Sequence, residues 1–78
     1  MLKNDIYAIY TDDNERTGSI KELFYSFDEA MEARCHYANW FRDEGDVWIQ
    51  QYKANTNFSC SHSWHINKNG SIVSEYDF

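Results

Sequence analysis

Residues 58–66 read FSCSHSWHI, and this short stretch decides how the sheet of the protein is arranged. Successive side chains of an extended strand point to opposite faces. One face then receives the large or reactive side chains, which are Phe58, Cys60, His62, Trp64 and Ile66. The other face receives Ser59, Ser61, Ser63, His65 and Asn67. We therefore predict a strand over residues 58–67 whose first set faces a core and whose serines face outward.

The turn that follows, NKNG at residues 67–70, sets which side chains of the last strand join the core face. A two-residue turn sends the large apolar groups of that strand to the serine face. A three-residue loop with Gly70 in the left-handed conformation instead pairs Ile66 with Ile72 and His62 with Tyr76. We prefer this loop because it brings three large apolar side chains to the core, namely Ile72, Tyr76 and Phe78.

A helix is predicted to begin after Ser26, because Ser26-Phe27-Asp28-Glu29 has the spacing of a capping box. Gly45 is placed to end the helix. At helical spacing the apolar side chains fall on one side, which holds Phe27, Ala30, Ala33, Tyr37, Ala38, Trp40 and Phe41. The alanines of this stripe allow the helix to approach a sheet closely.

The other strands follow from β-branched and aromatic residues at alternating spacing. Residues 5–11 (DIYAIYT) predict a first strand, and residues 20–25 (IKELFY) are a weaker candidate for a second. After Gly45 the period changes from 3.6 to 2, which predicts a strand of about seven residues from Val47. The expected fold is therefore α+β, with an antiparallel sheet of four or five strands, one helix packed on one face and the order β(β)αβββ. We expect a single domain over residues 1–78.

An even-length turn near Asn55 and Thr56 places Val47 opposite Trp64 and Ile49 opposite His62. The outer face of the sheet then carries Trp48, Tyr52, Ser59, Ser61, Ser63, His65, Val73 and Glu75. Large aromatics among small hydroxyls are typical of protein-recognition surfaces. An equally weighted alternative is that the loop at residues 11–19, or the N-terminus, covers Trp48 and Tyr52.

The charge balance of 7 basic and 13 acidic residues gives a net charge of −6. Nucleic-acid binders usually present a basic face, and the seven basic residues are scattered singly. We therefore expect no direct binding to nucleic acid. The first residues, MLKND, show no signal segment and no run is long enough to span a membrane, so we expect a cytoplasmic protein.

Five metal-ligand or nucleophile side chains are present in the central part of the chain: Cys35, His36, Cys60, His62 and His65. A tetrahedral zinc site needs about four ligands that converge, whereas strand alternation turns His65 away from Cys60 and His62. Neither cysteine lies at a helix N-terminus that would activate it, and no phosphate-binding glycine loop is present. We therefore expect no metal site, no cofactor and no enzymatic activity.

In size, acidity, aromatic content and lack of proline, the chain resembles the small inhibitors that phages and mobile elements encode, including anti-CRISPR and anti-restriction proteins. This resemblance implies a protein partner whose basic, nucleic-acid-binding surface is blocked. The expected contacts are two aromatics with their neighbours, Trp48, Tyr52, His65 and Glu75, and three acidic clusters: Asp12, Asp13 and Glu15; Asp28, Glu29 and Glu32; Asp43, Glu44 and Asp46. The alternative function is a structural or accessory protein that forms a homodimer or larger oligomer.

Overall fold

The computed structural model describes residues 3–12, 18–40, 47–57 and 59–78. In chain order its elements are β1 (Ile6–Asp12), β2 (Gly18–Phe24), the α-helix α1 (Phe27–Ala33), the 3-10 helix η1 (Arg34–Trp40), β3 (Val47–Tyr52), β4 (Cys60–Ile66) and β5 (Ile72–Asp77). The α+β fold is confirmed. The weaker strand candidate at residues 20–25 is present as β2, so the described part of the chain forms five strands.

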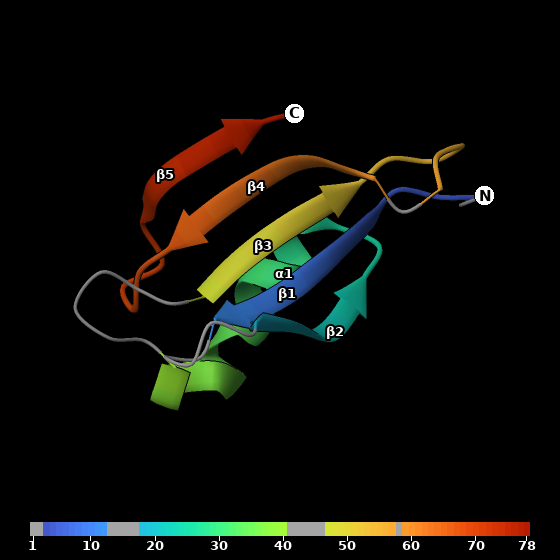
Figure 1. Cartoon of the computed structure of the whole chain (residues 1–78). Helices are drawn as coiled ribbons and strands as arrows, with labels where there is room; N and C mark the ends of the chain where they lie inside the picture. The colour runs from blue at the N-terminus through green and yellow to red at the C-terminus, as the bar shows by residue number, and fades with distance from the viewer. Residues whose placement is uncertain (1–2, 13–17, 41–46, 58) are drawn as a thin grey trace.

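The five strands form one antiparallel sheet in the order β2-β1-β3-β4-β5. The helical segment lies across one face of this sheet (Figure 1), where it contacts β1, β2 and β3. We call this side the helix face and the opposite side the outer face. Strands β2 and β5 are the two edges of the sheet.

The helix begins at the predicted cap. Ser26 has extended backbone angles, and its Oγ accepts a hydrogen bond of 3.1 Å from the N–H of Glu29. The carboxylate of Glu29 returns to Ser26 and accepts from its hydroxyl at 3.1 Å, which closes the box between two side chains. After Ala33 the α-helix tightens into η1, which is kinked at Tyr37. The predicted C-terminal cap at Gly45 lies outside the described residues.

The core lies between the helical segment and the helix face of the sheet. Its buried apolar side chains are Ile9, Ala30, Ala33, Val47, Ile49 and Ile66. Ala30 is fully buried and leaves no bulk between the helix and the sheet, as the alanine stripe predicts. Aromatic rings close the end of the core near the start of the helix, where the ring centroids of Phe27 and Trp64 lie 4.7 Å apart.

The β3–β4 pairing differs from the prediction by two residues. Val47 lies opposite Ile66, and Ile49 lies opposite Trp64. A bulge between Gln51 and Tyr52 lengthens the connection, which the assumption of a simple even-length turn does not include. Because the shift is an even number, Trp64, His65 and Ile66 keep their predicted faces. Beyond the bulge the prediction is wrong for Cys60, which lies opposite the groove residue Tyr52 and therefore on the outer face. Phe58 lies outside the described residues.

The β4–β5 pairing corrects the prediction for the last strand. Gly70 is left-handed, with φ of +85°, and Ile66 pairs with Ile72, both as expected. A bulge next to this pair then shifts the register by one residue. His62 therefore lies opposite Asp77 instead of Tyr76. Since a shift of one residue exchanges the faces of a strand, two side chains predicted for the core lie on the outer face instead: Tyr76 and Phe78.

Candidate functional site

The outer face of the sheet contains a groove of about 490 Å³ that crosses the strands. Its floor is a row of small or flat side chains, since Ala8 of β1 lies opposite Gln50 of β3 and Gln50 lies opposite Ser63 of β4. Its lining is dominated by rings: Tyr10, Trp48, Gln50, Tyr52, Ser63, Tyr76 and Phe78. Alternate residues of each strand share this face, so the small side chains lie between aromatic side chains two residues away along the strands. This difference in side-chain size creates the hollow.

One wall of the groove is built from stacked rings. The Trp48 indole stacks on the His65 imidazole, with centroids 4.3 Å apart and planes at 4°. Tyr76 of β5 stacks on the same indole at 5.8 Å and 29°. The three rings come from three neighbouring strands, so the sheet itself holds the wall in place.

A second wall is set by Tyr52, whose hydroxyl donates a hydrogen bond of 2.9 Å to Oε1 of Gln50 on the floor. Burial raises the pKa of Tyr52, and the neighbouring Cys60 and Tyr10 groups add to the shift. The hydroxyl therefore stays protonated and remains a donor at neutral pH.

The rim of the groove is open. Tyr76 is 53% exposed and Phe78 is 77% exposed, and further large apolar side chains of this face, Ile20 and Leu23 of β2, are also exposed. Among the elements that the structure describes, none packs against the outer face, because the helical segment lies on the other side (Figure 1). Exposed, contiguous apolar surface of this kind marks an interaction site in soluble proteins.

The predicted site residues separate into distinct regions. Trp48, Tyr52 and His65 lie together on the outer face as predicted, and both aromatics are half-buried. Three acids of α1 lie on the opposite side of the sheet and are exposed: Asp28, Glu29 and Glu32. The described residues do not include Asp13, Glu15, Asp43, Glu44 and Asp46, nor the side chain of Asp12. The proposed covering loop at residues 11–19 likewise lies largely outside the described residues.

Glu75 is a correction, since the bulge in the β4–β5 pairing moves it to the helix face. It lies opposite Trp64, and its Oε2 is 3.5 Å from Nε2 of His62. Asp77 approaches the other ring nitrogen of His62, also at 3.5 Å. His62 is thus held between two carboxylates at the β5 edge, and its ring packs against that of Trp64 with centroids 4.2 Å apart and planes tilted by 35°.

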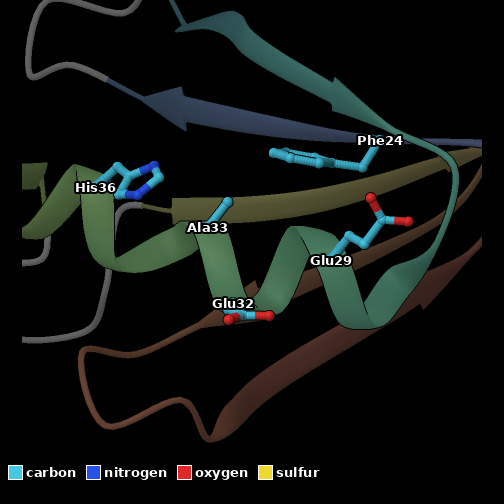
Figure 2. Close-up of a pocket in the computed structure, with 5 residues that line it drawn as sticks. All are labelled: Phe24, Glu29, Glu32, Ala33 and His36. Atoms are coloured by element: carbon cyan, nitrogen blue, oxygen red, sulfur yellow. The ribbon is translucent and has the colours of Figure 1, made fainter.

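A second, acidic hollow of about 280 Å³ lies between α1 and the end of β2. Figure 2 shows the Phe24 ring over the helix, with Glu29 and His36 toward opposite ends of the hollow. His36 lies 3.9 Å from the carboxylate of Glu22, which also accepts a hydrogen bond from the Tyr37 hydroxyl. Two acids near the hollow therefore already have partners within the protein: Glu22 contacts His36 and Tyr37, and Glu29 accepts a hydrogen bond from Ser26.

The five ligand-type side chains do not converge. Within the described ranges, no group of three or more His, Cys, Asp or Glu side chains is placed to hold a metal ion. Cys60 donates its thiol hydrogen to the carbonyl of His62 at 3.2 Å, and burial raises the pKa of the Cys60 thiol. Cys35 is exposed on η1.

Four groove residues were missed by sequence reasoning: Tyr10, Gln50, Tyr76 and Phe78. Strand alternation over residues 5–11 and 47–52 could have located Tyr10 and Gln50. Tyr10 lies opposite Trp48, and Gln50 lies two residues after Trp48 on the same strand, so all three side chains share the outer face. Tyr76 and Phe78 depend on a bulge that no local residue pattern locates.

Comparison with known proteins adds no relative: no protein-family model, no curated protein and no solved structure matches the chain. None of the described helices is long and apolar enough to cross a membrane. The outer-face groove is therefore the feature on which a functional assignment rests.

Proposed function

We propose that the chain is a protein-binding inhibitor that attaches to its partner through the outer face of the sheet and blocks a basic, nucleic-acid-binding surface of that partner. The observation that carries the proposal is the open aromatic groove, with its stacked Trp48, His65 and Tyr76 wall. Aromatic side chains dominate binding energy at the centres of protein interfaces. The sheet already orders the aromatic side chains of the groove, so binding a partner there costs little side-chain conformational entropy.

The net charge of −6 supports a basic partner. Opposite net charges accelerate association, whereas buried rings slow dissociation. The α1 acids lie on the far side of the sheet from the groove, so they act on the partner through the overall field of the molecule and not as direct contacts of the groove.

The test is affinity capture from the native host with the folded chain as bait, followed by competition between the captured protein's nucleic acid and the chain. Phe78→Ala should weaken partner binding by about 30-fold, because a large aromatic side chain that becomes buried in an interface contributes about 2 kcal/mol. Trp48→Ala should act in the same direction, mainly through faster dissociation. Circular dichroism should show that both variants keep the fold.

Tyr25→Ala is the matched control, because Tyr25 is an exposed aromatic that does not line the groove. Equal binding by Tyr25→Ala and Phe78→Ala would contradict the outer face as the binding surface. Partner binding that leaves nucleic acid in place would contradict the blocking function.

A second candidate function is self-association, and the exposure of Tyr76 and Phe78 on the outer face favours it. Two outer faces pressed together would form a sheet-on-sheet sandwich. The two functions differ in the oligomeric state of the purified chain.

A further inference from the structure

The free edge of β5 is a surface that the groove does not use. Among the described elements the backbone of β5 lies beside that of β4 alone, whereas the opposite edge strand, β2, also lies beside α1. Bulges discourage strand pairing. One interrupts β2 beside Lys21, and one lies at Val73 near the start of β5, after which residues 74–77 pair regularly with β4. Of the two edges, β5 is therefore the one that is ready to accept another strand.

The backbone groups at this edge have a definite direction. The N–H of Phe78 donates to the carbonyl of Ser61 at 3.0 Å, so residue 78 is turned toward β4. Hydrogen-bonded and non-hydrogen-bonded pairs alternate along an antiparallel ladder. Tyr76, opposite Ser63, is therefore turned toward β4 as well, and the N–H and C=O groups of Glu75 and Asp77 point away from the sheet.

The two faces of the β5 edge differ in chemistry. On the helix face lie Glu75 and Asp77, which are 55% and 86% exposed and are only partly engaged by His62. On the outer face lie Tyr76 and Phe78, which line the groove. The edge is thus acidic on one face and aromatic on the other.

We infer that this edge binds an extended basic segment of the partner protein as a sixth strand of the sheet, an inference that rests on the proposed protein-binding function. The outward backbone groups of Glu75 and Asp77 supply the ladder hydrogen bonds, as in other cases of strand addition. Residues directly opposite each other in a strand pair share a face. The added strand therefore carries Lys or Arg opposite Glu75 and Asp77, with an apolar side chain between them beside Tyr76.

A second copy of the chain fits this edge less well. Pairing of β5 with β5 would bring Glu75 and Asp77 of both copies to the same face, and each copy carries a net charge of −6. Like charges on neighbouring strands destabilise the pair. The charge pattern thus selects a basic segment over a second copy.

The experiment uses a capped nine-residue peptide of alternating lysine and valine, added to the full chain and followed by amide hydrogen exchange in NMR spectra. We expect the N–H groups of Glu75 and Asp77 to become at least tenfold better protected, while that of Tyr76, already bonded to β4, changes little. A peptide of the same composition with its lysines grouped at one end should bind at least tenfold more weakly.

Two variants separate backbone pairing from charge. Asp77→Pro removes an outward N–H without touching the β4 ladder, so it should abolish the peptide-induced protection, whereas Asp77→Asn keeps the N–H and should retain most of it. The double variant Glu75→Lys with Asp77→Lys should lose the lysine peptide and bind a peptide with glutamate in place of lysine.

The inference is overturned if Asp77→Pro binds the lysine peptide as tightly as Asp77→Asn. It is also overturned if the amides of Glu75 and Asp77 are protected without peptide and lose that protection on dilution, because the edge would then bind a second copy of the chain. These outcomes leave the proposed function standing when partner capture still depends on Phe78. In the reverse result, the peptide binds at β5 but neither Phe78→Ala nor Trp48→Ala weakens binding of the partner. That result would contradict the proposed function and support strand addition at the β5 edge.

Discussion

At the scale of single residues, the two cysteines show how one residue type acquires two environments. Cys60 is half-buried at the start of β4 and its thiol hydrogen is engaged by the carbonyl of His62. Cys35 is exposed on η1. Burial raises the pKa of the Cys60 thiol, so less of the reactive thiolate is present at a given pH.

We therefore expect iodoacetamide at pH 8 to alkylate Cys35 at least about tenfold faster than Cys60 in the folded chain. Because the pKa of Cys60 is raised, its alkylation rate should keep increasing at pH values where that of an ordinary thiol has levelled off. Mass spectrometry of the two tryptic peptides measures both rates. In urea the rates should converge, and equal rates in the folded chain would contradict the buried position of Cys60.

At the scale of elements, the start of α1 depends on a single side chain. The Ser26 hydroxyl satisfies the N–H of Glu29, which has no partner within the helix. Ser26→Ala should lower the free energy of unfolding by about 1 kcal/mol, which corresponds to a decrease of roughly 4–8 °C in melting temperature for a domain of this size. Urea and thermal unfolding followed by circular dichroism measure the effect.

Ser59→Ala is the control for this prediction, since Ser59 is exposed and precedes β4. It should change stability by less than about 0.5 kcal/mol. Equal losses in the two variants would show that the capping box contributes nothing specific.

The elements also show where sequence reasoning ends. The alternation of FSCSHSWHI correctly separates His62 from His65, because a strand's period is fixed by its backbone; His62 lies beside Trp64 on the helix face, and His65 lies on Trp48. The helix start was equally predictable, because the capping box is a local signal. The faces of Tyr76 and Phe78 were not, since a one-residue bulge next to Ile66 reverses them.

The candidate site was predictable in the same uneven way. Trp48, Tyr52 and His65 follow from alternation alone, and the structure places all three on one face. Glu75 was assigned to the wrong face for the same reason as Tyr76. The α1 acids are separated from the groove because the helix covers the face of the sheet opposite the groove aromatics. Which face the helix covers is a property of tertiary packing that no single segment encodes.

At the scale of the whole molecule, apolar surface and charge oppose each other. The outer face exposes enough large side chains to favour self-association, whereas the net charge of −6 disfavours bringing two copies together. The relative weight of the two effects decides between an external partner and a homodimer.

We expect repulsion to dominate at neutral pH, so that the chain sediments as a monomer at micromolar concentration and low ionic strength. As the pH is lowered toward the isoelectric point of about 4.8, the net charge falls to zero and self-association should appear. Phe78→Ala should reduce this association, and Tyr25→Ala should leave it unchanged, because only Phe78 lines the groove. A dimer at pH 7 that persists from low salt to 1 M salt, where the Debye length is about 3 Å, would instead show that the outer face is built for a second copy and that no external partner is needed to cover it.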